Sequence, residues 1–120
     1  MAEAESERLL RATQTIGLSV SSDQIKQLVA YLDLLEKWNR TYNLTAIKNR
    51  RVMFERHLVE SISIAPFLSG KSRVDVGTGA GLPGVPLAII EPNAHYVLLD
   101  SNGKKTRFLL EVKRALGLSN

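Results

Sequence analysis

The chain has 120 residues, of which 44% are hydrophobic, and its formal net charge is +4 at pH 7. This length and apolar content predict a folded globular domain and exclude a disordered chain. The absence of Cys excludes disulfides and thiol catalysis, and two His are too few for a typical zinc site, so we expect no metal.

The distribution of apolar and charged residues indicates the compartment of the protein and the kind of partner that it binds. No apolar run approaches the length of a membrane span, and the first residues are too acidic for a signal peptide, so we expect a cytoplasmic protein with no membrane partner. Acids outnumber bases up to Glu36, whereas bases dominate from Lys37 to Arg56. The basic segment predicts a polyanionic partner, with a solvated surface as the alternative.

Two helices are expected in the first third of the chain. Residues 2–16 have an amphipathic helical pattern. Ser21 and Gln24 then form a capping-box pattern, after which apolar residues recur at helical spacing up to about Arg40. This second helix has the stronger periodicity and should form a large part of the core.

A loop and a third helix should follow. Residues 39–47 suit turns better than helix interiors, and we expect an ordered loop there. Asn49 can cap a helix over residues 50–64 that Pro66 closes. The side chains expected on the inner face of this helix are Val52, Leu58, Ile62 and Ala65.

The stretch from Arg73 to Asp100 organises the second half. It reads as a short strand over residues 73–76, a glycine-rich turn, an apolar helix over residues 85–90 and a second strand that ends at Asp100. Glycines in such a strand-to-helix turn allow positive φ or the close approach of a ligand. The order is typical of the first half of a Rossmann-type nucleotide site.

The details of the glycine turn favour one ligand over others. The dinucleotide fingerprint has its third glycine one position after Gly81, where Leu82 stands, so S-adenosylmethionine, which has no phosphates, fits better than NAD. Asp75 could attract the ammonium group of S-adenosylmethionine or order the glycine-rich loop. Asp100, about 20 residues beyond the turn, could accept hydrogen bonds from ribose hydroxyls. The expected cofactor-binding residues are Asp75, Gly77, Gly79, Gly81, Leu82 and Asp100, and an NAD-dependent oxidoreductase is the alternative.

A last helix is expected over residues 102–116, with Ser101 as its cap, Gly117 as its stop, and Lys104 and Lys105 among its outward side chains. Strand, helix, strand and helix give only two parallel strands, which cannot cover their own apolar faces, so the sequence looks like the front part of a longer protein.

These elements define an α/β fold class. We expect a helical N-terminal cap over residues 1–70, followed over residues 71–120 by the first half of a Rossmann-like methyltransferase sheet.

The sequence also resembles a known family, on four motifs: Lys37-Trp38-Asn39-Arg40-Thr41-Tyr42-Asn43-Leu44-Thr45, Arg56-His57-Leu58-Val59-Glu60-Ser61, Val74 to Leu87 with its Gly-Leu-Pro-Gly extension, and Leu98 to Lys105. It is similar to the bacterial 16S rRNA guanine-N7 methyltransferases, called rRNA small subunit methyltransferase G or glucose-inhibited division protein B. The resemblance implies S-adenosyl-L-methionine as donor and 16S rRNA of the small ribosomal subunit as substrate. It also implies donor contacts at Gly77, Leu82 and Asp100.

The implied chemistry needs no catalytic acid or base, because guanine N7 carries a lone pair that can attack a methyl group directly. We therefore expect no catalytic residue, and His57 should pack or contact an RNA phosphate. Trp38 should pack in the core, with base stacking by Trp38 and Tyr42 as the alternative. The expected phosphate contacts are Arg40, Lys48, Arg50, Arg51, Arg56, Lys104 and Arg107. A non-catalytic RNA-binding module is a further alternative.

Overall fold

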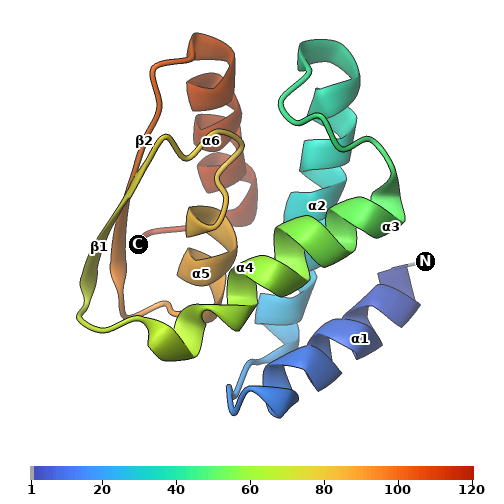
Figure 1. Cartoon of the computed structure of the whole chain (residues 1–120), viewed down its shortest axis with the longest axis vertical. Coiled ribbons are helices and arrows are strands. Elements are labelled where there is room, and N and C mark those ends of the chain that lie inside the picture. Colours follow the sequence, from blue (N-terminus) through green and yellow to red (C-terminus); the bar gives the residue numbers. More distant parts are fainter. Residues whose placement is uncertain (1) are drawn as a thin grey trace.

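The computed structural model describes residues 2–120 and consists of a helical part and a small sheet with its own helices (Figure 1). The helical part begins with α1 (Ala2–Thr15) and α2 (Ser22–Tyr42), which pack against each other. The predicted capping box of α2 is confirmed. Gln24 N donates to Ser21 Oγ at 3.1 Å, and Ser21 N donates to Gln24 Oε1 at 2.7 Å.

The helix α2 is longer than predicted. It continues past Arg40, and Asn43, in the left-handed conformation with a φ of 51°, ends it. The buried Asn39 holds the loop that follows. Its side chain accepts a hydrogen bond from Thr45 N at 2.9 Å and donates one to Ile47 O at 3.4 Å. The loop is therefore ordered, as predicted, but it begins later than expected.

Residues 50–67 form a helical rod with an irregular middle. Its elements are α3 (Arg50–Met53), the π-helical segment η1 (Phe54–Val59), α4 (Glu60–Ser63) and the 3₁₀ segment η2 (Ala65–Phe67). Asn49 caps α3 as predicted, and its side chain accepts from Val52 N at 3.1 Å. At helical spacing from Leu58 and Ile62, the inner position in the first part of the rod is Phe54 and not Val52. Val52, expected to face inward, is therefore 42% exposed, while Phe54 is buried.

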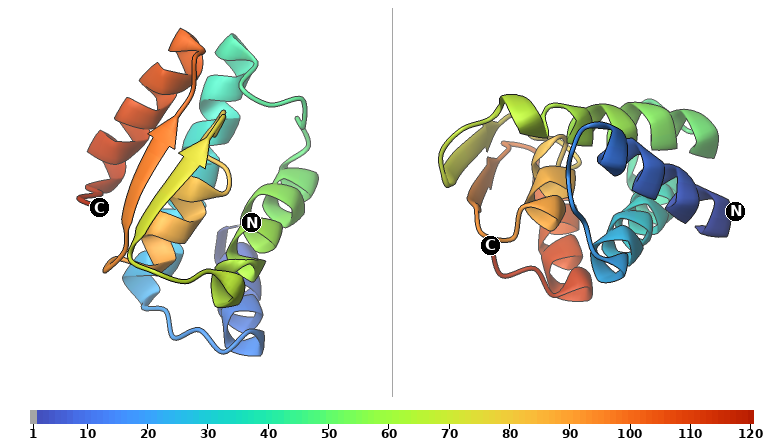
Figure 2. Two further views of the ribbon diagram at one scale, coloured as in Figure 1. Left: turned by 60° about the vertical axis from the view of Figure 1, so that its left-hand side comes forward. Right: turned by 90° about the horizontal axis from the view of Figure 1, so that it is seen from below.

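The sheet contains two parallel strands, β1 (Ser72–Val76) and β2 (His95–Leu99). Helix α5 (Gly84–Ile90) connects them, and α6 (Gly103–Leu116) follows β2. Both helices lie on the same face of the sheet (Figure 2). The parallel order and the helical N-terminal part confirm the predicted α/β class.

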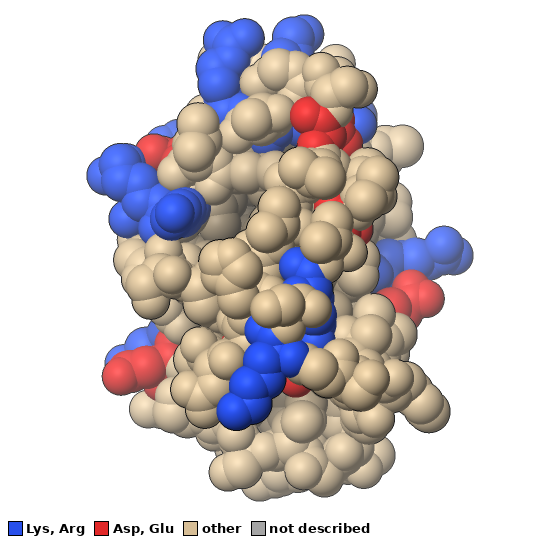
Figure 3. All heavy atoms as spheres, turned by 90° about the vertical axis from the view of Figure 1, so that its left-hand side faces the viewer, with Lys and Arg blue, Asp and Glu red and all other residues tan. Residues whose placement is uncertain are grey.

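The other face of the sheet is apolar and exposed. Its side chains are Val74, Val76, Val97 and Leu99, which are 62%, 77%, 40% and 48% exposed. In the residues that the structure describes, no helix covers this face (Figure 2). Lys and Arg side chains gather at its upper end and in a band below its middle, while much of the surface between them carries no charge (Figure 3).

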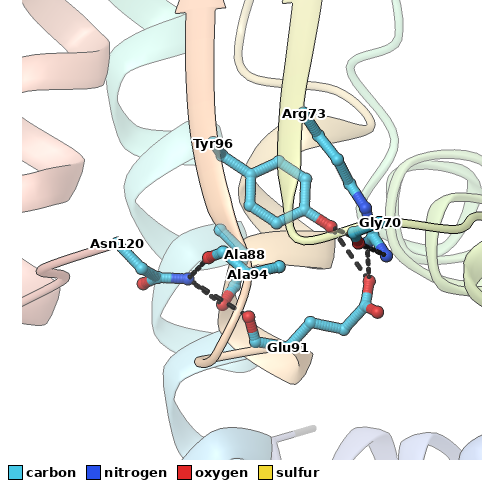
Figure 4. A network of polar contacts seen from close by, with 7 residues as sticks. All are labelled: Gly70, Arg73, Ala88, Glu91, Ala94, Tyr96 and Asn120. Atoms are coloured by element: carbon cyan, nitrogen blue, oxygen red, sulfur yellow. Dashed lines mark hydrogen bonds and ion pairs between the residues drawn. The ribbon is translucent and has the colours of Figure 1, made fainter.

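A polar network fixes the amino ends of the strands (Figure 4). The largely buried Arg73 pairs with Glu91, contacts the Tyr96 hydroxyl and donates to Gly70 O at 3.0 Å. Nearby, Asn120 Nδ2 donates to the carbonyl oxygens of Ala88, Glu91 and Ala94, at 2.9, 3.3 and 3.0 Å. These bonds lie at the edge opposite the glycine turn, so they fix the sheet without occupying the predicted site.

Helix α6 begins one residue later than predicted. Its cap is Asn102, whose Oδ1 accepts from Lys104 N at 3.0 Å and from Lys105 N at 3.3 Å, and not Ser101. Both residue types cap helices well, so the sequence could not separate them. Gly117, left-handed with a φ of 65°, ends the helix as predicted.

A single apolar core joins the helical part to the α/β part. Leu28 and Leu32 of α2, Leu58 of η1 and Phe108 of α6 are all fully buried within it. The helices bury their apolar faces here, and within residues 2–120 none is long and apolar enough to cross a membrane.

Candidate functional site

The glycine loop follows β1 and is tied to the end of β2. Gly77 N and Thr78 N both donate to Leu99 O, at 2.8 and 3.0 Å. The three glycines of the loop have positive φ, as predicted: 69° at Gly77, 61° at Gly79 and 94° at Gly81. The loop therefore needs glycine for its conformation, and the two strand ends are held side by side.

Glycine has a second purpose at the start of α5. A Cβ at Gly84 would lie 2.0 Å from Leu98 Cδ2, and one at Gly81 would lie 2.5 Å from Val85 Cγ2. Gly84 therefore allows α5 to pack closely on β2, and Gly81 leaves room for Val85 of α5 and Leu109 of α6. A Cβ at Gly77 would meet nothing within 4 Å, so the outer side of the loop is open there.

Asp75, in β1, orders the glycine loop through hydrogen bonds of its side chain. Its Oδ2 accepts hydrogen bonds from Thr78 Oγ1 at 2.7 Å and from Gly84 N at 3.0 Å. Thr78 is buried, which places this contact inside the turn. Of the two roles considered for Asp75, the geometry is that of loop ordering.

Asp100 lies directly after β2 and reaches the same loop. Its Oδ2 accepts from Gly79 N and its Oδ1 from Asn102 N, each at 2.8 Å. The backbone N–H groups of Asn102 and Gly79 lower the pKa of the Asp100 carboxyl, because they stabilise its charged form. An ionised carboxylate therefore stands at the carboxyl edge of the sheet, where both predicted strand ends meet.

Tyr31 of α2 supports the loop from the helical part, and sequence analysis missed it. Its hydroxyl donates to Ala80 O at 2.7 Å, and the side chain is fully buried. Burial, with a smaller contribution from Asp75, raises the pKa of Tyr31, so the hydroxyl keeps its proton and remains a donor. A tyrosine on the apolar face of a helix is a signal that its hydroxyl requires a buried partner.

Lys105 also lies beside the loop, although it was expected to face outward. A Cβ placed on Gly79 would be 4.0 Å from both Cδ and Nζ of Lys105. Its charge contributes to the lowered pKa of Asp100. The first turn of α6 thus places a cation next to the carboxylate at the strand ends.

Arg50, one of the predicted phosphate contacts, is held by carboxylates. Its guanidinium forms ion pairs with Glu5 at 2.7 Å, Asp33 at 2.8 Å and Glu36 at 3.3 Å. The hydrogen bond with Glu5 is the main reason why its pKa is raised. Arg50 therefore joins α1 and α2 to α3, and its charge is already neutralised by residues far away in the sequence.

The other predicted cations are exposed and form two groups. Lys48, Arg51 and Arg56 belong to the loop before α3 and to the helical rod. Arg40 lies in the last turn of α2, and Lys104 and Arg107 lie in the first two turns of α6, at the ends where these two helices lie side by side (Figure 1). Lys48 Nζ donates to Asn43 Oδ1 at 3.5 Å, so Lys48 lies beside the end of α2.

His57 lies on the π-helical segment and contacts the loop after α2. Its Nε2 is 3.0 Å from Thr45 Oγ1, which also accepts from Ile47 N at 3.3 Å. Burial lowers the pKa of His57, opposed by the charge of Glu60. The imidazole is therefore held in its neutral form, and it belongs to the network by which Asn39 orders the loop.

Comparison with known proteins identifies relatives. The family model described as rRNA small subunit methyltransferase G matches residues 24–120. The protein of that name from Saccharophagus degradans is 56% identical over 94% of this chain and 51% of its own length. Those from Nitrosococcus oceani and Klebsiella pneumoniae are 55% and 50% identical over 88% and 94% of this chain, and 49% and 55% of their lengths.

The chain spans about half the length of these relatives. The match includes α2 from Gln24 onward, the glycine loop, Asp100 and α6, that is, the segments that form and support the glycine loop. The chain therefore belongs to the rRNA small subunit methyltransferase G family.

Proposed function

We propose that the protein transfers the methyl group of S-adenosylmethionine to N7 of a guanine in 16S rRNA of the small ribosomal subunit. The observation that carries this proposal is the hydrogen bond between Asp100 and Gly79, which joins the acidic strand end to the glycine loop in a member of this family. Because the chain spans half of its relatives, the activity is proposed for the complete gene product.

The hydrogen bonds of the loop favour a donor that lacks phosphates. A pyrophosphate binds to free backbone N–H groups at such a turn. Here these groups are used within the protein, by the carbonyl oxygens of Leu99 and Thr78 and by the carboxylates of Asp75 and Asp100. The N–H groups engaged in this way are those of Gly77, Thr78, Gly79, Gly81, Leu82 and Gly84. This pattern opposes an NAD-dependent oxidoreductase.

The residues that would hold the donor are Asp100, through the ribose hydroxyls, Gly77, where the loop is open, and Leu82. S-adenosylmethionine supplies an electrophilic methyl group when bound. Guanine N7 needs no deprotonation, so the protein requires no general base. Holding the two reactants in line can contribute roughly 7–11 kcal/mol, and the bond from Tyr31 to Ala80 O keeps the loop in position for this.

The RNA substrate would be bound through the exposed cations. Lys48, Arg51 and Arg56 form one part of this surface, and Arg40, Lys104 and Arg107 form the other. Arg50 is left out of the proposed set because three carboxylates already bind it. Phosphate contacts of this kind position RNA without reading its sequence.

The test is methyl transfer by the complete gene product with radiolabelled donor and 16S rRNA. We expect label on guanine N7, and none on a transcript in which 7-deazaguanosine replaces guanosine. Calorimetry should detect binding of S-adenosylmethionine and not of NAD. Label that persists on the 7-deazaguanosine transcript, or selective NAD binding, would overturn the proposal.

A further inference from the structure

Aromatic rings form a continuous row between α2 and α6. The ring centroids of Tyr31 and Phe108 are 6.2 Å apart, those of Phe108 and Trp38 are 5.5 Å apart, and those of Trp38 and Tyr42 are 5.3 Å apart. The inner end is fully buried at Tyr31, whose hydroxyl bonds to the glycine loop at Ala80 O. The row therefore leads from the proposed donor site toward the surface.

The outer end of the row is open to solvent. Tyr42 is 40% exposed, although Trp38, one helical turn earlier, packs against the core. The chain leaves the helix at Asn43, and the loop after it is bound to Asn39 through Thr45 N. An exposed tyrosine whose ring contacts another aromatic ring is suited to receive a further flat ring.

The surroundings of Tyr42 are basic. Helices α2 and α6 run in opposite directions (Figure 1), and they touch at Trp38 and Phe108. One turn further toward this end of each helix are Tyr42 and Lys104, respectively. Arg107 belongs to the same turn as Lys104 and is exposed. No Asp or Glu occurs from residue 37 to residue 54, or from residue 101 to residue 110.

We propose that Tyr42 is a stacking platform for an unpaired nucleobase of the RNA substrate, with Lys104 and Arg107 binding the adjacent phosphates. This inference rests on the proposed function and adds to it a preference for single-stranded RNA. A base within a duplex is already stacked on its neighbours and cannot place its face on Tyr42, whereas an unpaired base can. Stacking accepts any base, so the platform selects unpaired structure and not sequence.

The experiment uses the complete gene product and two probes of mixed sequence, a single-stranded oligoribonucleotide and the matching perfect duplex. Tyr42→Leu should weaken binding of the single strand roughly 5- to 100-fold, the value of one stacked base. Tyr42→Phe keeps the ring and should stay within about twofold of wild type. Phe67→Leu, which removes an aromatic ring that is 86% exposed elsewhere, should have no effect.

Affinity for the duplex and the slope of affinity against salt should be equal in all four proteins. A second readout is independent of variant stability: a single strand that carries 2-aminopurine should lose fluorescence when it binds to wild type and to Tyr42→Phe. If wild type and Tyr42→Leu bind the single strand with equal affinity, Tyr42 is not a stacking platform. The methyltransferase proposal would be unaffected by that result. A wild-type protein that binds neither probe would overturn the proposed RNA substrate itself.

Discussion

Asp100 Oδ2 accepts a hydrogen bond from Gly79 N at 2.8 Å, so the end of β2 and the loop after β1 are directly joined. The carboxylate is thereby oriented before any ligand arrives. Its other oxygen is fixed by Asn102 N, also at 2.8 Å. A group held by two backbone N–H donors loses little freedom on binding, which favours recognition of a ribose.

Replacement of Asp100 by Ala should weaken binding of S-adenosylmethionine. The loss of charge-assisted hydrogen bonds predicts a change of about 1.5–3 kcal/mol in the binding free energy. Calorimetry on the complete gene product measures this change. Asp23→Ala, at an exposed aspartate in the first turn of α2, is the matched control and should bind normally. An unchanged dissociation constant in Asp100→Ala would remove this residue from the proposed site.

Tyr31→Phe should destabilise the protein and loosen the glycine loop. The substitution leaves the buried carbonyl of Ala80 without its partner at 2.7 Å, which costs about 1–3 kcal/mol in the free energy of unfolding. Urea denaturation measures this cost, and donor titration should show weaker binding. Tyr42→Phe, which keeps the ring and alters an exposed hydroxyl, should leave stability unchanged. Normal stability of Tyr31→Phe would show that Tyr31 does not support the loop.

Neighbouring arginines on the helical rod should behave differently. Replacing Arg51 and Arg56 by Ala should reduce the slope of log RNA affinity against log salt by roughly 1 to 2, because each phosphate contact releases counterions. Thermal stability should remain the same. Arg50→Ala should instead lower the unfolding free energy by about 1–3 kcal/mol, since it leaves Glu5, Asp33 and Glu36 without their cation.

The reverse result would be an Arg50→Ala protein that is stable but has a reduced slope of log RNA affinity against log salt. It would show that Arg50 contacts RNA phosphates. Equal slopes in wild type and the Arg51/Arg56 double variant would make those two residues part of an ordinary solvated surface.

Stability should fall in mildly acidic solution because of His57. Its pKa in the folded protein lies below the ordinary value of 6.5, so the unfolded chain takes up this proton at a higher pH than the folded one. The contribution to the unfolding free energy is complete above about pH 6.5 and decreases as the pH falls from there to the folded-state pKa. Urea denaturation at pH 7.5, 6 and 5 should show this loss, and His57→Gln should reduce it. An identical pH dependence in both proteins would assign the loss to other groups.

A polypeptide of these 120 residues should associate with itself through the outward face of its sheet. Val74 and Val97 are partners in the strand register on that face, and both are exposed. Light scattering should therefore give a mass above 13.3 kDa. Val74→Thr with Val97→Thr should shift the population toward the monomer, whereas Val52→Thr, at an exposed valine on the helical rod, should not. A wild-type monomer would contradict this prediction.

Local signals in the sequence were sufficient to predict much of the fold. The capping box at Ser21, the cap at Asn49, the positive-φ glycines and the stop at Gly117 depend on residues close together in the chain, and all are confirmed. The inward assignment of Val52 was wrong because Phe54, four residues before Leu58, holds the inner position, and the π segment was not predicted because it has no sequence pattern that separates it from an α-helix.

The parts that could not be predicted depend on contacts between distant segments. Arg50 looked like one cation in a basic run, and only folding brings Glu5 to it. Tyr31 and Lys105 each belong to a regular helical pattern, and nothing in that pattern indicates that both reach the glycine loop. Side-chain direction at the ends of packed helices is a tertiary property, so sequence periodicity alone cannot assign it.

The row of aromatic rings also makes the protein its own optical reporter. Trp38 is the one tryptophan of the chain, and its ring contacts both Tyr42 at the surface and Phe108 in the core. Its emission should therefore respond to a nucleobase that arrives at the outer end and to any movement of α6 at the inner end. Both events can be followed in the unlabelled chain, by excitation of a single indole.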